Sequence, residues 1–273
     1  MQGTIAQVVA LTTHGNSILQ GIPDLRSLEF QASNSTFTYC EFVHFSHPAS
    51  RFQIRKDSVY AADPHNWFER LRKEGVSALR MSYRPSAENK IADRMLVGFV
   101  GGGGKWLIET RGPKHSDFWE SRWIVGNKDS CDKKIWRVTY MRIATSKPSD
   151  RDYSENLEGL KEEMRENLMQ ITQFSRSQNL DWFTKAFESG LSRLDSRTPF
   201  EGLYHKDIAP IDFLPLFAEQ LLGSAEAAWV FGGMGSWNDQ GFGGQTQERY
   251  EDLSESLYKL LNRVIVAAAN SRR

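Results

Sequence analysis

The fold is decided by residues 105–143, which read KWLIETR, GPKHSD, FWESRWIV, GNKDSCDK and KIWRVTYMRI in order along the chain. The first, third and fifth pieces are rich in aromatic and β-branched residues, and two polar turns separate them, which is the pattern of consecutive strands. Turns this short join antiparallel neighbours, because parallel strands need a crossover of a dozen or more residues. We therefore expect an antiparallel meander. Residues 94–100 are expected to add a further strand, joined to residues 105–111 by Gly101–Gly104, so that the four strands form two hairpins in series.

The rest of the first half also predicts strands. Residues 4–13 and 76–83 are dense in β-branched and apolar side chains, and residues 36–45 alternate with a period of two. Asp63 and Pro64 are typical of the N-cap and first turn of a short helix. Within the meander we expect one face to join the core, formed by Trp119, Trp123, Trp136, Val138 and Tyr140.

The pattern changes near residue 147, where helical spacing replaces alternation. We expect a long helix capped by Ser149 or Asp150, because the apolar residues that follow recur at steps of three and four. Three further helices are expected, each with an apolar stripe, over residues 181–194, 211–222 and 245–269.

These elements predict an α+β protein. An N-terminal antiparallel β-sheet, a meander of hairpins with one short helix, packs against about four C-terminal α-helices. Residues 1–149 hold 21 Lys and Arg against 14 Asp and Glu, a balance of +7, and residues 150–273 hold 13 against 20, a balance of −7. Opposite charges and apolar faces that need cover favour two layers of a single domain, residues 1–273. The layers are a basic β-rich layer over 1–147 and an acidic helical layer over 148–273.

Composition narrows the class of protein. Cys40 and Cys131 are too few for a disulfide framework or a cysteine zinc site, so we expect buried thiols in a reducing compartment. The N-terminus lacks the pattern of a secretory signal, and no apolar run reaches the roughly 18–20 residues that span a bilayer. This favours a cytoplasmic protein without a membrane partner. No metal-ligand spacing or cofactor motif occurs, so we expect neither a metal nor a cofactor.

One segment stands apart, the Gly-rich loop of residues 232–244, GGMGSWNDQGFGG. Glycines let a backbone approach a ligand closely, an indole offers a stacking surface, and the polar side chains offer donors and acceptors. Binding residues also favour loops. The candidate ligand-binding residues are Gly233, Gly235, Ser236, Trp237, Asn238 and Asp239.

The same loop also fits a structural role, as a compact Ω-loop that plugs its tryptophan into the core. A dinucleotide fingerprint does not fit, because the third glycine position after Gly233–Gly235 holds Asn238. A phosphate loop at Gly101–Gly104 does not fit either, since Lys105 is followed by Trp106 in place of Ser or Thr.

Three functions stay open. The leading hypothesis is a non-enzymatic module that binds a small molecule or a protein through the Gly-rich loop, since the sequence holds no catalytic motif. The second is an enzyme acting on a small polar substrate, with Asp239 and either His205 or Glu248 as the acid–base residues. The third is nucleic-acid binding by the basic, aromatic segment 111–142, which is less favoured because the net charge of the chain is zero.

Overall fold

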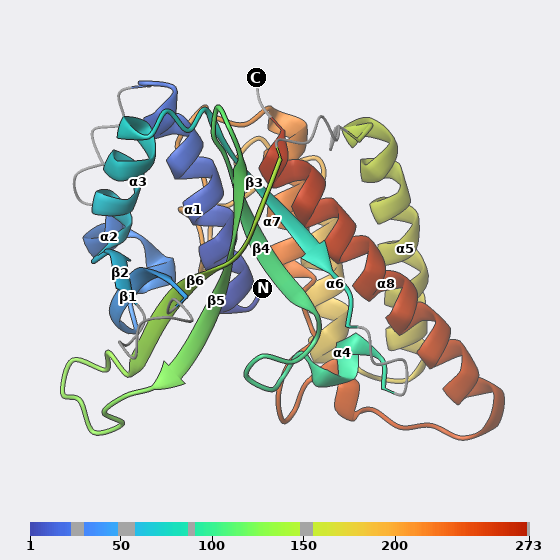
Figure 1. Ribbon diagram of the computed structural model, residues 1–273. Helices are drawn as coiled ribbons and strands as arrows, with labels where there is room; N and C mark the ends of the chain where they lie inside the picture. The colour runs from blue at the N-terminus through green and yellow to red at the C-terminus, as the bar shows by residue number, and fades with distance from the viewer. Residues whose placement is uncertain (23–29, 49–57, 87–90, 148–154, 272–273) are drawn as a thin grey trace.

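The computed structural model describes residues 1–22, 30–48, 58–86, 91–147 and 155–271 (Figure 1). Strands are concentrated before residue 147 and long helices after it, so the α+β class fits. The elements in chain order are α1 (Gly3–Leu19), α2 (Phe30–Ser33), η2 (Ser35–Phe37), β1 (Cys40–His47), β2 (Ser58–Ala61), α3 (Pro64–Lys73), β3 (Ala78–Arg84), α4 (Asp93–Leu96), β4 (Lys105–Arg111), β5 (Ser116–Val125), β6 (Trp136–Ser146), α5 (Leu157–Ser177), α6 (Asp181–Arg193), α7 (Leu216–Ala227), η3 (Trp237–Asp239) and α8 (Gly244–Asn270).

The described strands form one sheet in the order β2-β1-β6-β5-β4-β3. The chain makes the hairpin β1–β2, crosses through α3 to β3 at the far edge, and returns as the meander β3–β4–β5–β6, which ends beside β1. β1 and β6 are parallel, while the other neighbours are antiparallel. The expectation of a purely antiparallel sheet is therefore wrong at this pair. Short turns fix only the strands that they join, and β1 and β6 are distant in sequence.

The strand expected over residues 4–13 is wrong, because these residues belong to helix α1. Every residue from Ile5 to Ser17 is buried, and α1 contacts β3, β4, α3 and α8. Figure 1 shows α1 behind the strands. A helix that is buried all round has no face that meets water, so its periodicity does not distinguish it from a buried strand.

The strand expected over residues 94–100 is also wrong. Asp93–Leu96 form the short helix α4, and the outer partner of β4 is β3, with Tyr83 opposite Trp106. The turns after α4 pack tightly against the Gly-rich loop, since a Cβ added to Gly98 would lie 2.6 Å from the carbonyl carbon of Gly232. This close approach is a tertiary contact, which the local pattern of residues 94–100 does not reveal.

The helices of the second half agree closely with the sequence pattern. α6 and α8 confirm the predictions over 181–194 and 245–269. α7 begins at Leu216, five residues later than predicted, because Pro215 is its extended N-cap residue. α5 begins at Leu157 with the Asn156 side chain as its N-cap. The predicted caps Ser149 and Asp150 lie outside the described residues.

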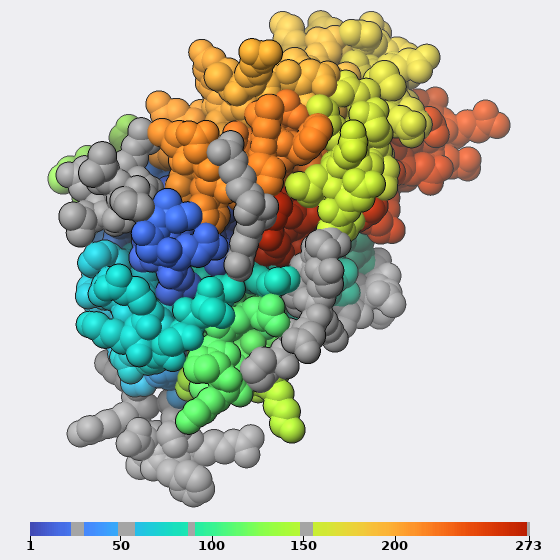
Figure 2. Space-filling view, turned by 90° about the horizontal axis from the view of Figure 1, so that it is seen from above, coloured from blue at the N-terminus to red at the C-terminus, as the bar shows by residue number. Residues whose placement is uncertain are grey.

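One hydrophobic cluster runs through both halves of the chain. Of the predicted core face of the meander, Trp119, Val138 and Tyr140 are buried, while Trp123 and Trp136 are half-buried at its edge. Figure 2 shows blue N-terminal atoms lying directly against orange atoms of the helical half. In the described part of the chain, no helix has both the length and the apolar character that a bilayer crossing demands.

Candidate ligand pocket

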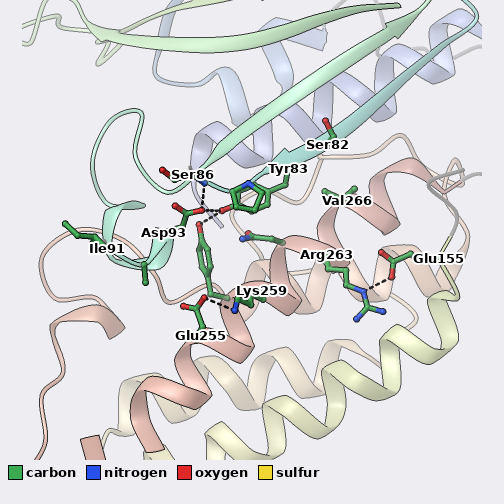
Figure 3. A pocket seen from close by; sticks show the side chains of 14 residues that line it. Ser82, Tyr83, Ser86, Ile91, Asp93, Glu155, Glu255, Lys259, Arg263 and Val266 are labelled. Atoms are coloured by element: carbon green, nitrogen blue, oxygen red, sulfur yellow. Dashed lines mark hydrogen bonds and ion pairs between the residues drawn. The ribbon is translucent and has the colours of Figure 1, made fainter. Parts of the chain in front are cut away.

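A pocket of about 730 Å³ lies between α8 and two short stretches of chain, residues 82–86 and residues 91–93 (Figure 3). Glu255, Asn262 and Val266 line it from α8, because helix positions three, four or seven apart share one face. Tyr83 lines it from the end of β3, and Asp93 lines it from the start of α4. The volume falls in the range of about 300–1,000 Å³ that small-molecule sites occupy.

Two tyrosines and a carboxylate form one wall of the pocket. Tyr83 Oη donates to Asp93 Oδ2 at 2.8 Å, and the backbone amide of Ser86 donates to the same oxygen at 2.9 Å (Figure 3). Tyr258 Oη donates to the carbonyl oxygen of Gly103 at 2.7 Å. Burial raises the pKa of both phenols above the ordinary tyrosine value. Both hydroxyls therefore stay protonated at neutral pH, and their hydrogens are already donated within the protein.

Asn262 is the unusual polar group of the pocket. Its side chain lines the cavity and is only 3% exposed. Neither Nδ2 nor Oδ1 makes a hydrogen bond among the described residues. The amide lies beside Tyr258, but it does not reach hydrogen-bond geometry with that phenol. A buried amide without a partner costs about 1–3 kcal/mol of stability, so a group that pairs with it would be bound favourably.

Charged side chains lie around the pocket, and opposite charges are paired there. Lys259 Nζ lies 3.2 Å from Glu255 Oε1, and Arg263 Nε lies 2.7 Å from Glu155 Oε2. Arg263 also contacts Glu163 at 2.6 Å. Figure 3 shows the first two pairs on the α8 side of the cavity. These ion pairs neutralise much of the charge at this rim.

The side chain of Trp237, a predicted ligand contact, lies inside the protein. It is fully buried, and its Nε1 donates to Ser254 Oγ of α8 at 2.7 Å. Its ring contacts the rings of Phe174, Phe183, Phe187 and Tyr250. The indole is therefore enclosed by core side chains.

The remaining predicted residues of the Gly-rich loop hold the loop together. Asp239 Oδ2 accepts hydrogen bonds from the backbone amides of Gly235 at 2.5 Å and Ser236 at 3.2 Å. Asn238 is buried, and its Nδ2 donates to the carbonyl oxygen of Arg94 at 2.5 Å. Gly233 has open space around its Cα. These contacts are those of a self-packed loop anchored on α4 and α8, and a ligand role for these residues stays a prediction.

The second predicted acid–base residue, His205, lies in a different cluster. Its Nδ1 lies 3.1 Å from Ser35 Oγ, which donates to Asp207 Oδ1 at 2.5 Å. Its backbone amide donates to Glu226 Oε1 at 2.8 Å. Among the described residues, none of the hydrogen bonds or ion pairs joins His205 to Asp239. The structure thus gives the two predicted acid–base residues separate partners.

The thiols and the metal-binding residue types form no centre of their own. Cys40 is buried, as expected, and burial raises its pKa to about 11. Cys131 is exposed, contrary to expectation. Within the described ranges, no cluster of three His, Cys, Asp or Glu side chains suits a metal ion.

Several cations of the basic segment 111–142 have acidic partners on the sheet itself. Arg137 Nε lies 2.7 Å from Glu41 Oε2, and Arg142 Nη1 lies 3.2 Å from Asp117 Oδ2. Strands therefore supply these counter-charges locally, without help from the acidic helices. Nucleic-acid binding by this segment stays a prediction.

The pocket residues form no recognisable motif in the sequence. The one signal for Asn262 is its position in α8, where Leu260, Leu261, Val264 and Ile265 surround a lone amide. A polar residue inside an apolar helix segment indicates a buried polar contact, but it does not say with what.

No family model, curated protein or solved structure matches this chain. Function is therefore inferred from the pocket itself.

Proposed function

We propose that this protein binds a small molecule in the pocket between α8 and residues 82–86 and 91–93. One observation carries the proposal: the Asn262 amide is buried, lines a cavity of ligand size, and has no hydrogen-bond partner among the described residues. Buried polar groups in folded proteins are nearly always paired, and an exception calls for an explanation. A ligand that pairs with the amide supplies one.

Water alone is a weaker explanation of the cavity. A water molecule occupies about 30 Å³ in the liquid, and a buried water needs two to four polar partners. The cavity measures about 730 Å³, and apolar side chains such as Pro85, Ile91 and Val266 line much of it. Such surface favours the apolar body of a larger molecule.

The pocket favours binding over catalysis. A general acid or base works best when its pKa lies near the working pH. Burial moves the pKa of Tyr83 and Tyr258 away from neutrality, and both hydroxyls already donate to fixed acceptors. Asn262 offers an amide without a hydrogen-bond partner among the described residues, and an amide recognises a ligand without exchanging a proton.

The Gly-rich loop supports this proposal because its contacts position two elements that line the pocket, α4 and α8. Asn238 fixes the backbone of Arg94 in α4, and the Arg94 guanidinium forms an ion pair with Glu251 of α8. Arg94 Nε also lies 3.7 Å from Glu255 Oε2, on the pocket face of the same helix. The loop thereby holds α4 and α8, two walls of the pocket, at a fixed separation.

The test compares a pocket variant with a matched control. Asn262→Leu replaces the unpaired amide by an apolar group of similar size, so the ligand-free protein should gain about 1–3 kcal/mol in free energy of unfolding. A thermal-shift screen against a broad metabolite set should find compounds that stabilise the wild type, and these should stabilise Asn262→Leu far less. A compound at a hundred times its Kd stabilises by about 2.7 kcal/mol.

Ser224→Ala is the control, because Ser224 Oγ is also buried without a hydrogen-bond partner in the described part of the chain, but it lies on α7, outside the pocket lining. This variant should keep the full response to every compound found. The proposal fails if no compound stabilises the wild type, or if Asn262→Leu responds like the wild type.

A further inference from the structure

The hydrogen-bonding groups of the Asn262 side chain indicate which donors and acceptors a ligand would need. A carboxamide offers N–H donors on one atom and carbonyl lone pairs on the neighbouring atom, in one plane. Neither Nδ2 nor Oδ1 of Asn262 has a hydrogen-bond partner among the described residues, and the side chain borders the pocket. A ligand that satisfies both at once needs an acceptor and a donor side by side. An asparagine reads adenine in the same two-point manner, through N7 and N6.

The charges near the pocket argue against an ionic ligand. The Lys259 ammonium lies 3.2 Å from Glu255, and the Arg263 guanidinium is shared by Glu155 and Glu163. An anion would have to compete with these carboxylates for its partner, and a cation would have to compete with Lys259 or Arg263. Moving an unpaired charge from water into such a site is costly.

The remaining lining residues indicate which kind of molecular frame the pocket can hold. Ile91 and Val266 lie on opposite sides of the cavity in Figure 3, and Pro85 and Ala92 add further apolar surface. None of these side chains has a hydrogen-bonding group, so they fit a flat or compact hydrocarbon or heterocyclic frame.

From these three features we infer that the ligand is an uncharged molecule with an amide edge, an N–H beside a C=O, on an apolar ring. Primary carboxamides, lactams and the amide edges of nucleobases belong to this class. The inference rests on the proposed function and deepens it, since it assigns the ligand chemistry of the same pocket.

Benzamide, N,N-dimethylbenzamide and benzamidine form a matched probe series on one ring. Benzamide presents a donor and an acceptor, the dimethyl compound has lost the donor, and benzamidine, cationic at neutral pH, presents donors alone. Binding is measured by ligand-observed NMR titration. The wild type should bind benzamide at least about tenfold more tightly than either analogue, because each analogue leaves part of the amide unpaired.

Two variants test the role of Asn262 in this preference. Asn262→Asp offers acceptors alone, so at about pH 8 it should reverse the order and prefer benzamidine to benzamide by about tenfold. Asn262→Leu offers no polar group, so it should lose the difference between benzamide and its dimethyl analogue. The second variant keeps the test decisive if a buried aspartate prevents folding.

Different results separate the two proposals. If the wild type binds metabolites in the thermal-shift screen but does not prefer benzamide, the amide-edge inference is overturned and ligand binding stands. If Asn262→Leu folds and keeps the preference for benzamide, the assignment to Asn262 is overturned. If neither the metabolite set nor the probes bind the wild type, both proposals fall.

Discussion

Trp237 and Asn262 are both buried in the helical half, and they differ in whether their polar atoms are paired. Trp237 Nε1 donates to Ser254 Oγ, whereas neither polar atom of Asn262 has a partner among the described residues. A paired buried donor adds about 1 kcal/mol of stability, while an unpaired one costs about 1–3 kcal/mol. At the scale of single residues, this difference separates a side chain that supports the fold from one available to a ligand.

Replacing Trp237 tests the structural role of the Gly-rich loop. Trp237→Ala removes a fully buried indole that packs against four aromatic rings, so it should lower the free energy of unfolding by about 3–5 kcal/mol in urea denaturation. Trp182→Ala is the matched control, because Trp182 is 66% exposed, and it should cost less than about 1 kcal/mol. Equal effects of the two variants would contradict the structural role.

His205 should make stability depend on pH. Burial, assisted by the N-terminal ammonium, lowers its pKa from 6.5 to about 4. Because the folded pKa lies below the unfolded value, the unfolded chain binds more protons between these two pH values, so stability rises with pH through this window and falls on acidification. The full difference corresponds to about 3 kcal/mol.

The pH dependence is isolated by comparing wild type with His205→Asn, which keeps an amide nitrogen near the position of Nδ1, facing Ser35. Urea titrations from about pH 4 to 7 should show a smaller rise in the variant. Glu226 contributes with opposite sign, because burial raises its pKa, but it is present in both proteins, as are Asp207 and the N-terminal amine. Parallel curves for the two proteins would show that His205 does not titrate as described.

At the scale of elements, the sequence predicted the helices with one apolar and one exposed face. It did not predict α1, which is buried on every side. The apolar stripes of α5, α6 and α8 can be recognised in the sequence because the other faces of these helices are exposed to water. α1 is surrounded by strands and helices, so its β-branched residues looked like a strand. The stretch predicted from the sequence, residues 4–13, is short enough for a strand, so its length did not separate the two structures.

Gly15 shows how closely α1 is packed. A Cβ at this position would meet Leu79 Cδ1 and lie 2.7 Å from Phe68 Cε1, and both side chains are buried. Gly15→Ala should therefore destabilise by about 1–2 kcal/mol despite the better helix propensity of alanine. Gly3→Ala meets open space at the start of the same helix and should change stability by less than about 0.5 kcal/mol. Thermal unfolding of both variants measures the difference, and a stabilised Gly15→Ala would contradict this packing.

At the scale of the whole molecule, the pocket depends on neighbours that the sequence order does not reveal. Tyr83 and Asp93 belong to the strand half, and Asn262 belongs to the last helix. The β5–β6 hairpin followed from its turn, but the parallel pairing of β1 with β6 and the approach of α8 to β3 arise only when the chain closes on itself. Local sequence patterns therefore predict most helices and strands, whereas the pocket is formed by tertiary contacts that these patterns do not reveal.

The contacts between the halves predict that neither half folds alone. The Asn270 side chain exchanges two hydrogen bonds with the backbone of Met81, at 2.8 and 2.9 Å, and Thr13 Oγ1 donates to the carbonyl oxygen of Ile208 at 2.6 Å. α1 loses its cover from α8 when the chain is cut. Fragments 1–147 and 155–273, expressed separately, should lack near-ultraviolet circular dichroism and cooperative unfolding, because each would expose half of a shared core. Mixed, they should recover both signals together with any response to pocket ligands, because residues of both fragments line the pocket. Cooperative unfolding of either fragment alone would show instead that the halves are independent domains.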